Sequence, residues 1–419
     1  MVGLMTAELD VYFQNDLMGH LWLDSRRRFT FRYDQTWLTK LGAIPLSLSL
    51  PLKGGAFEDD ASRPFFANLL PEADVRRAVA RRLGISEHND FALLEAIGGE
   101  CAGAVTVLPA GALLSHEGRY RPIDEKELHE IVVSLPVKPF LAGEEGLRLS
   151  LAGAQNKLPV YVEGNGVFLP MGSYPSSHIL KPPIRDWPET VENEAFCMAL
   201  AGRLGLPVPS AMIRKGIDTL YLVERYDRKR DETGRLIRLH QEDFCQALGI
   251  PPDQKYESEG GSSLCQCFSL LSEKSIRPSV DRKLLLNWVV FNYLTGNADA
   301  HAKNIALLLT ADGPLLAPFY DLLCTGVYKE LTDKLSMKIG GENRPDWIQL
   351  RHWQRFADDA VIKPKLVIGT LQGMAEKITI VADGLANEFR GRYGETPVLD
   401  AILDVIKDRS HRAMLYLKA

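Results

Sequence analysis

The first part of the chain shows short runs of hydrophobic residues with the spacing of β-strands and helices. L-D-V-Y-F (9–13) and F-T-F-R-Y (29–33) are alternating or aromatic runs, which suit half-buried strands. Between about 56 and 100 the apolar spacing becomes helical, and residues 98–109 indicate a glycine-rich turn that enters another strand. We therefore predict a first unit over residues 1–110.

A second group of strands is predicted between residues 111 and 228. Residues 158–169 alternate around E-G-N-G, which indicates a hairpin, and residues 219–227 form another strand pattern. Between these runs, S-H-I-L-K (177–181) is a short strand that ends on a lysine, and residues 191–205 show an amphipathic helix that stops at glycine. This unit is expected to be rich in β-structure.

After about residue 240 the pattern is mainly helical. Its strongest element is residues 281–296, a core helix for which Asp281 is placed as the N-terminal cap. We predict a third unit over residues 229–419. The order of elements predicts an α+β, two-lobed protein-kinase-like fold, with a small β-rich N-terminal lobe, an extra N-terminal subdomain and a larger all-helical C-terminal lobe.

Composition narrows the possible classes of protein. At 419 residues the chain is too long for one core, and its net charge of -5 gives no general attraction to nucleic acid or an anionic membrane. No signal-peptide pattern or membrane-spanning run is found. The six cysteines have neither C-x-x-C nor zinc-site spacing, which favours a reducing compartment. We expect a cytoplasmic protein with no membrane partner.

Candidate chemistry begins directly after the predicted core helix, in N-A-D-A-H-A-K-N (297–304). Phosphoryl transfer needs a carboxylate near the attacking hydroxyl and oxygen ligands that hold Mg²⁺ on the phosphates. Asp299 and Asn304 have the spacing with which protein kinases place these groups on one loop. The pair alone is a weak signal, because chance supplies it often and a loop aspartate can simply cap a helix.

The next segment strengthens the kinase interpretation. Residues 305–310 and 315–320 are two apolar strands joined by the turn A-D-G-P. This hairpin would return Asp321 to the region of Asp299, which is the kinase arrangement of a second metal-binding aspartate. The constellation predicts Asp299 as catalytic base and Asp321 and Asn304 as magnesium ligands.

The β-rich unit is expected to supply the other phosphate contacts. Lys181 is the candidate for the α/β-phosphates, and the following helix offers Glu192 and Glu194 as partners, of which Glu194 is preferred. Neither glycine-rich nucleotide motif is present. Instead, S-L-A-G-A-Q-N-K (150–157) has small residues through which backbone amides can approach an anion, and Lys157 adds positive charge, although an ordinary turn has a similar sequence.

Together these motifs resemble the HipA kinases, toxins of bacterial HipBA modules. The resemblance is carried by S-L-A-G-A-Q-N-K, S-S-H-I-L-K, V-E-N-E, L-V-E-R-Y-D-R, Q-E-D-F-C-Q, K-Y-E-S-E-G-G, N-A-D-A-H-A-K-N and P-F-Y-D. P-L-S-L-S-L-P-L (45–52), N-L-L-P-E (68–72) and G-A-V-T-V (103–107) are similar to that family's N-terminal subdomain. The similarity spans most of the chain in the family's order.

The resemblance implies roles for further residues. Ser150 matches the serine that these kinases autophosphorylate, which ejects the phosphate loop and switches the enzyme off. A phosphoserine adds about −1.5 to −2 charges beside a site built for phosphate, which is a reason for this effect. The implied ATP contacts lie on the phosphate loop, the ATP lysine, the adenine linker (mainly its backbone) and the catalytic region. They are Ala152, Gly153, Ala154, Gln155, Asn156, Lys157, Lys181, Glu224, Arg225, Tyr226, His301, Lys303, Asn304, Tyr320 and Asp321.

The resemblance also implies a biological activity. It is that of an ATP- and Mg²⁺-dependent serine/threonine protein kinase that phosphorylates an aminoacyl-tRNA synthetase, in the best-known case glutamyl-tRNA synthetase. Translation then stops and growth arrests in a drug-tolerant, persistent state. The implied partner is a HipB-like helix-turn-helix antitoxin, and the complex represses its own operon. The net acidity of this chain agrees with an antitoxin that makes most of the operator DNA contacts.

The chain departs from the family pattern at two places, and the second of them leaves the substrate open. Asn156 stands where a familiar member has glutamate, and after Cys324 the match is loose, at D-K-L-S-M-K (333–338), where an activation loop would select substrate. Two other functions also stay open. A small-molecule or lipid kinase would share the same aspartates and asparagine, whereas a non-catalytic co-repressor would usually have lost a metal ligand, and none is lost here.

Overall fold

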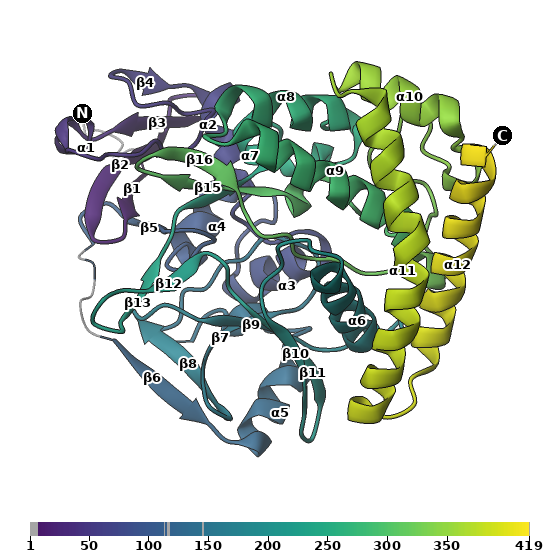
Figure 1. Ribbon diagram of the computed structural model, residues 1–419. Helices are drawn as coiled ribbons and strands as arrows, with labels where there is room; N and C mark the ends of the chain where they lie inside the picture. Colours follow the sequence, from purple (N-terminus) through teal and green to yellow (C-terminus); the bar gives the residue numbers. More distant parts are fainter. Residues whose placement is uncertain (1–6, 113, 115–117, 145, 419) are drawn as a thin grey trace.

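A five-stranded antiparallel sheet organises the N-terminal part of the computed structural model, which describes residues 7–112, 114, 118–144 and 146–418 (Figure 1). Along β3, Phe29, Phe31 and Tyr33 are buried while Thr30 and Arg32 are more exposed, so one face packs on the helices. The strands, in the order β4-β3-β2-β1-β5, are β1 (Glu8–Phe13), β2 (Asp16–Leu23), β3 (Phe29–Tyr33), β4 (Ala56–Phe57) and β5 (Val105–Pro109). The helices are α1 (Gln35–Thr39), α2 (Asp59–Ala67), α3 (Ala73–Leu83) and α4 (Asp90–Ile97).

A second, six-stranded sheet carries the predicted ATP lysine. Its central strand β9 pairs antiparallel with β11 and with β7, so that Lys181 lies opposite Tyr221 at the end of β9. The strands, in the order β10-β11-β9-β7-β8-β6, are β6 (Gly118–Ile123), β7 (Leu158–Glu163), β8 (Gly166–Gly172), β9 (His178–Lys181), β10 (Ala211–Lys215) and β11 (Thr219–Glu224). The helices that accompany them are α5 (Glu125–Ser134) and α6 (Thr190–Arg203).

The remainder is mainly helical, but the prediction of an all-helical lobe is wrong. The strands β14 (Gln241–Asp243), β15 (Ala306–Thr310) and β16 (Gly313–Leu316) form a sheet within it, because the buried apolar strand β15 needs a hydrogen-bonding partner on each side. A hairpin of β12 (Arg228–Arg230) and β13 (Leu236–Arg238) precedes this sheet. The helices are α7 (Phe244–Leu248), α8 (Leu264–Lys274), α9 (Pro278–Thr295), α10 (Leu350–Asp359), α11 (Pro364–Tyr393) and α12 (Pro397–Lys418), and the 3₁₀ turns include η2 (Pro252–Gln254), η3 (Glu257–Glu259), η4 (Ala302–Asn304) and η6 (Pro345–Trp347).

The predicted capping role of Asp281 is also wrong. Helix α9 begins at Pro278, whose fixed φ suits the first helical position, so Asp281 lies inside the first turn. Its buried carboxylate accepts hydrogen bonds from the Ser275 hydroxyl, at 2.6 Å, and from the Leu316 amide, at 2.9 Å. Asp281 therefore fastens the start of α9 to the end of β16 rather than capping the helix.

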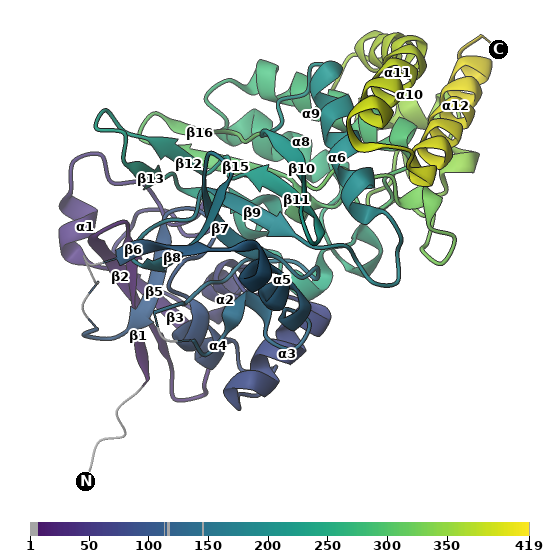
Figure 2. The same cartoon turned by 90° about the horizontal axis from the view of Figure 1, so that it is seen from below.

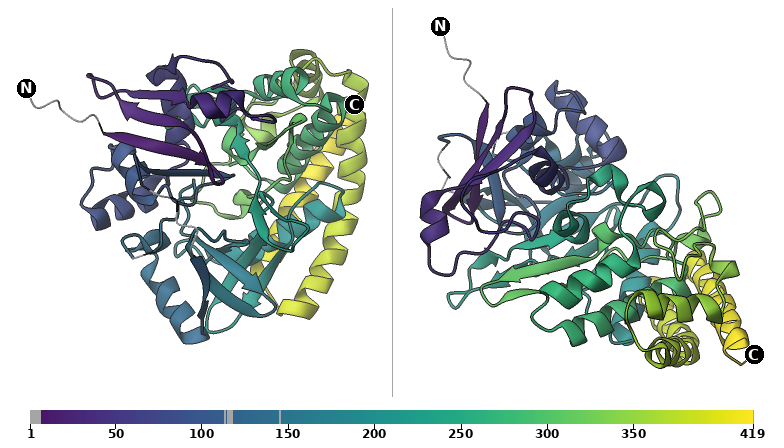
Figure 3. Two further views of the ribbon diagram at one scale, coloured as in Figure 1. Left: turned by 90° about the vertical axis from the view of Figure 1, so that its left-hand side faces the viewer. Right: turned by 90° about the horizontal axis from the view of Figure 1, so that it is seen from above.

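The N-terminal sheet packs closely against the rest of the chain. Figures 2 and 3 show it beside the second sheet, with α11 and α12 at the opposite end of the molecule. The division into units near residues 110 and 228 stays a prediction. In the part of the chain that the structure describes, no helix combines the length and apolar character needed to cross a bilayer.

Candidate active site

The predicted catalytic loop is a compact turn that follows α9. Gly296 ends the helix with φ of 70°, a left-handed conformation that costs glycine little. Beyond it, the Asn304 side-chain amide donates a hydrogen bond to the Asp299 carbonyl at 3.1 Å. The Asp299 side chain is 47% exposed, and one of its oxygens accepts a hydrogen bond from the Tyr256 hydroxyl at 2.9 Å. The loop thus fixes Asp299 beside Asn304 and leaves its carboxylate open to a substrate.

The β15–β16 hairpin delivers Asp321 to the lysine of the second sheet. Asp321 has φ of 54°, and its carboxylate forms an ion pair with the Lys181 ammonium. The same ammonium lies 2.8 Å from the carboxylate of Glu194 on α6. The structure therefore pairs Lys181 with Glu194, the preferred partner, and joins both to Asp321.

Burial and charge together set the protonation of this triad. Burial opposes the charged forms, but Asp321 and Glu194 overcome it and raise the pKa of Lys181 above its usual value. Lys181 and Lys157 likewise outweigh burial at Asp321 and hold the pKa of its carboxyl well below the usual range. Burial lowers the pKa of Lys157 to about 8. Asp321 is therefore a carboxylate at neutral pH, as a metal ligand must be.

The two predicted aspartates lie in one electrostatic environment. Burial alone would lower the pKa of Lys255, yet the carboxylates of Glu72, Asp299 and Asp321 together raise it. His301, whose pKa is lowered by burial, interacts electrostatically with both Asp299 and Asp321. The carboxylates that are 22 positions apart in the sequence thus both act on the charges of Lys255 and His301, and His301 Nε2 lies 3.8 Å from Asp299.

The segment that matches the phosphate loop is held by the N-terminal part of the chain. Gly153 has φ of 108°, and its carbonyl accepts a hydrogen bond from the Glu72 amide at 3.1 Å. The Lys157 ammonium donates to the Ala152 carbonyl. Gln155 donates weakly to the Pro182 carbonyl, at 3.4 Å, whereas Ala154 is exposed. These contacts keep the loop close to the end of β9.

Ser150 is fully buried in this arrangement. Its hydroxyl donates to the Leu69 carbonyl at 2.8 Å, and its amide donates to the Glu100 carbonyl at 3.0 Å. The residue that the family resemblance marks for phosphorylation is therefore inaccessible while the loop is in this position.

The predicted adenine linker follows β11, and its side chains point in different directions. Glu224 is exposed. The buried Arg225 guanidinium forms two hydrogen bonds with Asp227, at 2.9 and 2.8 Å. The ring of Tyr226 stacks on that of Tyr320, with centroids 5.5 Å apart. The Arg225 side chain is thus structural, which agrees with a linker that contacts a nucleotide through its backbone.

The remaining predicted contacts are Lys303 and His301, which are buried, and Tyr320, which is partly buried. The Lys303 side chain is only 5% exposed, and its ammonium lies 2.6 Å from the Asn68 side-chain oxygen and 3.2 Å from the carboxylate of Asp243. Tyr320 donates its hydroxyl to the Lys303 carbonyl at 2.7 Å. Within the described chain, His301 Nδ1 is buried and has no hydrogen-bond partner.

The donor set fits a nucleotide with magnesium. No cluster of three or more His, Cys, Asp or Glu side chains suited to a metal ion is found among the described residues. Mg²⁺ does not require one, because it usually takes one or two protein oxygens and completes its shell with water and phosphates. Asp321 and Asn304 offer such oxygens, and Asn156 Oδ1 and His301 Nδ1 are buried polar atoms without partners. The roles of these residues stay predictions.

Several residues near the site were not singled out as functional in the sequence. Glu72 contacts Lys255 at 2.9 Å and Lys303 at 3.7 Å, and Tyr256 contacts Asp299. The sequence did point to these residues, because they belong to N-L-L-P-E and K-Y-E-S-E-G-G. Both motifs contributed to the family resemblance, but no function was assigned to their residues.

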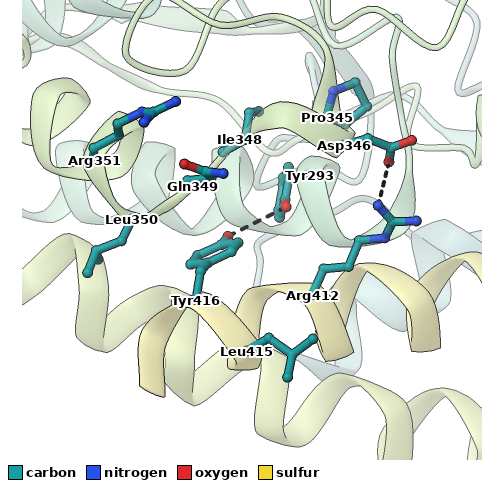
Figure 4. A pocket seen from close by; sticks show the side chains of 10 residues that line it. All are labelled: Tyr293, Pro345, Asp346, Ile348, Gln349, Leu350, Arg351, Arg412, Leu415 and Tyr416. Atoms are coloured by element: carbon teal, nitrogen blue, oxygen red, sulfur yellow. Dashed lines mark hydrogen bonds and ion pairs between the residues drawn. The ribbon is translucent and has the colours of Figure 1, made fainter. Parts of the chain in front are cut away.

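A pocket of about 540 Å³ lies away from this site, between α9, η6, α10 and α12 (Figure 4). Tyr293 and Tyr416 meet across it, and Asp346 pairs with Arg412 at its edge. None of the predicted catalytic residues lines it. It therefore plays no part in the chemistry described above.

Two models of known protein families match this chain, one in its N-terminal part and one in its C-terminal part. Residues 149–382 match the family model described as the HipA-like C-terminal domain, and residues 9–108 match the HipA N-terminal domain. The chain belongs to the HipA family. Both family models therefore lie in the order expected from the sequence, and together they cover most of this HipA-type chain.

Individual relatives agree with this assignment. A Sinorhizobium fredii protein named as a kinase, Y4mE, is 44% identical over 410 residues, which are 96% of this chain and 97% of that protein. The serine/threonine-protein kinase toxin HipA of Shewanella oneidensis is 33% identical over 89% of this chain and 88% of the toxin. The solved complex of Shewanella oneidensis HipA, HipB and operator DNA has a TM-score of 0.84 and 30% identity, and the match covers 98% of this chain and 97% of that one.

These findings confirm the kinase-like α+β fold and the HipA resemblance. The chain is a HipA-type serine/threonine protein kinase, related to a toxin of a toxin–antitoxin system. As a kinase it uses ATP.

Replacing Glu194 tests the triad. Burial raises the pKa of Glu194 to about 7 against the opposing effect of Lys181. Glu194→Gln removes one of the two carboxyl groups that hold Lys181, so we expect kcat/KM for ATP to fall by roughly 10- to 100-fold. Glu192→Gln is the matched control, since Glu192 lies on the same helix and forms no ion pair with Lys181. Steady-state turnover of ATP measures both. Equal effects of the two substitutions would show that the ion pair with Lys181 does not orient the nucleotide.

Proposed function

We propose that this kinase is the toxin of a type II toxin–antitoxin module and acts in the cytoplasm on a protein substrate. Its first candidate substrate is an aminoacyl-tRNA synthetase, glutamyl-tRNA synthetase above all, whose phosphorylation halts translation. The observation that supports the proposal is the convergence of Asp299, Asn304, Asp321 and Lys181 on a HipA fold.

The geometry suggests how these side chains divide the work. Asp321 and Asn304 are the proposed ligands of Mg²⁺, which would neutralise charge on the phosphates. Lys181, oriented by Glu194, is suited to the α/β-phosphates. Asp299, half exposed at the mouth of the loop, is suited to accept the proton of a substrate hydroxyl.

The proposed partner is a HipB-like helix-turn-helix antitoxin. HipA of Shewanella oneidensis was solved together with HipB and operator DNA, and the present chain is similar to that HipA over nearly its whole length. The net charge of -5 supports a complex in which the antitoxin supplies most contacts to DNA and both proteins repress the operon. A role as co-repressor alone is not favoured, because every predicted catalytic group is present.

We also propose that Ser150 is an autophosphorylation site that switches the kinase off. The buried position of its hydroxyl supports this proposal, because a phosphate cannot occupy it without uncompensated burial of about two negative charges. Phosphorylated Ser150 would have to leave its contacts with Leu69 and Glu100. The attached loop would then lose its position beside Lys181.

Growth assays test the toxin role. Expression of the chain without an antitoxin is expected to arrest a bacterial host, and Asp299→Asn is expected to relieve the arrest because loss of a catalytic base slows transfer by about 10²- to 10⁴-fold. Asp312→Asn, an exposed aspartate in the β15–β16 turn, is the control and stays toxic. If Asp299→Asn arrests growth as strongly as the wild type, the toxin does not act by phosphorylation. If phosphoproteomics finds no phosphorylated aminoacyl-tRNA synthetase, the proposed substrate is wrong.

Mass spectrometry and nucleotide binding test the Ser150 switch. After incubation with ATP and Mg²⁺ we expect a phosphopeptide that contains Ser150. We also expect Ser150→Glu to weaken ATP binding by more than about 100-fold, since a buried unpaired carboxylate costs several kcal/mol. Ser150→Ala and the exposed control Ser86→Glu are expected to bind ATP normally. Normal ATP binding by Ser150→Glu would contradict the switch.

A further inference from the structure

The first three residues of the motif K-Y-E-S-E-G-G (255–261) contact three different parts of the site. The Lys255 ammonium lies 2.9 Å from the Glu72 carboxylate. Tyr256 donates its hydroxyl to Asp299. Glu257 accepts a hydrogen bond from the Lys338 amide at 2.6 Å. The motif thus links the start of α3, the predicted catalytic loop and the segment after Cys324.

A second set of hydrogen bonds, through Ser336, connects the motif to the catalytic loop. The Glu257 amide donates to the Ser336 carbonyl at 3.1 Å, and the Ser336 amide donates to the Ala298 carbonyl at 2.9 Å. Ala298 directly precedes Asp299. The motif and residues 336–338 therefore clamp the loop that carries Asp299, which keeps Lys255 and Tyr256 in a fixed position relative to it.

A kinase needs a cation near the phosphoryl group that is transferred, because negative charge spreads over its three outer oxygens. Lys303, the lysine on the catalytic loop, is poorly placed for this task. Its ammonium is buried and engaged by Asn68 and Asp243 beneath the loop. To reach a phosphate it would have to leave both partners unpaired inside the protein.

Lys255 is better placed. Its side chain is 18% exposed, and it pairs with Glu72, whose amide donates a hydrogen bond to the Gly153 carbonyl of the predicted phosphate loop at 3.1 Å. The next residue, Tyr256, donates a hydrogen bond to Asp299 at 2.9 Å. A phosphoryl group in transfer must lie between the hydroxyl bound at Asp299 and the phosphates held near Asp321. Lys255 is therefore beside the path of transfer, and Glu72 is the carboxylate that holds it there before a phosphate arrives.

Tyr256 arranges the base itself. Its hydroxyl donates a hydrogen bond to Oδ1 of Asp299, while Oδ2 accepts no hydrogen bond from any residue that the structure describes. The Tyr256 ring meets the buried ring of His301 edge-on, with centroids 5.5 Å apart. Tyr256 thus restrains the rotation of the Asp299 carboxylate and leaves the second oxygen free for a substrate hydroxyl.

We propose that Lys255 is a catalytic residue that binds the transferred phosphoryl group, and that Tyr256 is a positioning residue for the Asp299 base. In the transfer, the substrate oxygen forms a bond to the γ-phosphorus of ATP while the bond from that phosphorus to the bridging oxygen breaks. ADP leaves with the electron pair, and the proton of the hydroxyl passes to Oδ2 of Asp299. Lys255 keeps its proton and its ion pair with Glu72, while another N–H of the same ammonium donates to the phosphoryl oxygens.

The test separates nucleotide binding from transfer in the full-length protein. Turnover is measured as the total loss of γ-phosphate from labelled ATP, and binding as the dissociation constant of ADP with Mg²⁺ by calorimetry. Because ADP lacks the γ-phosphate, a residue that contacts only this group affects turnover and leaves ADP binding unchanged. A residue that merely supports the fold affects both.

For Lys255→Met we expect turnover to fall about 100-fold while ADP binding changes by less than about threefold. Lys255→Arg is expected to keep roughly a tenth of wild-type turnover, because it retains the charge with a different shape. The matched control is Lys138→Met, since Lys138 also pairs with a glutamate, Glu144, outside the site. Turnover of Lys255→Met within threefold of the wild type, or a parallel loss of ADP binding, would overturn the role of Lys255.

For Tyr256→Phe we expect kcat to fall about 10-fold with KM for ATP unchanged, because only the orientation of the base is lost. Tyr120→Phe is the control, as it removes a tyrosine hydrogen bond of 3.0 Å, to the Pro175 carbonyl, away from Asp299. An unchanged kcat, or a higher KM with normal kcat, would remove Tyr256 from this role. The proposal rests only on kinase activity, so failure of the toxin role in growth assays would leave these measurements valid.

Discussion

The buried ammonium of Lys181, shared between Glu194 and Asp321, is the interaction on which the site depends. It joins the end of a strand in the second sheet, a helix that packs on that sheet, and the residue that follows the β15–β16 hairpin. The pair with Glu194 is buried on both sides, and loss of one partner from such a pair costs about 3–5 kcal/mol, whereas Asp321 is the more exposed partner of Lys181. The same pairing keeps Asp321 ionised, which is the form that its proposed role as a metal ligand requires.

The N-terminal part of the chain holds the predicted active site together. Its segment between α2 and α3 accepts a hydrogen bond from the Ser150 hydroxyl at Leu69 and donates one from the Glu72 amide to Gly153, and the Glu72 carboxylate pairs with Lys255. The buried Glu100 accepts hydrogen bonds from Ser176 and from Arg228, at 2.7 Å, beside the predicted adenine linker. We therefore expect a change in this part of the chain to act on the predicted phosphate loop and linker together, although it lies far from them in the sequence.

Local patterns predicted the elements that lie close together in the chain. The hairpin around E-G-N-G, the strand that ends at Lys181 and the spacing of Asp299 and Asn304 follow from periodicity and turn residues, and the structure contains each. Strand β6 escaped prediction because its sequence, G-R-Y-R-P-I, has the polar character of a sheet edge. The prediction that Asp281 caps the helix was wrong because the helix begins earlier, at Pro278. The contacts of Glu72, Lys255 and Tyr256 had no local signal, because they join segments more than forty positions apart.

The most direct measurement is a crystal structure of the protein with Mg²⁺ and a non-hydrolysable ATP analogue. The account predicts a metal ion bound by Asp321 and Asn304, α/β-phosphates on Lys181, and a γ-phosphate between Asp299 and Lys255. A nucleotide bound elsewhere, or bound with its γ-phosphate directed away from Asp299, would contradict it.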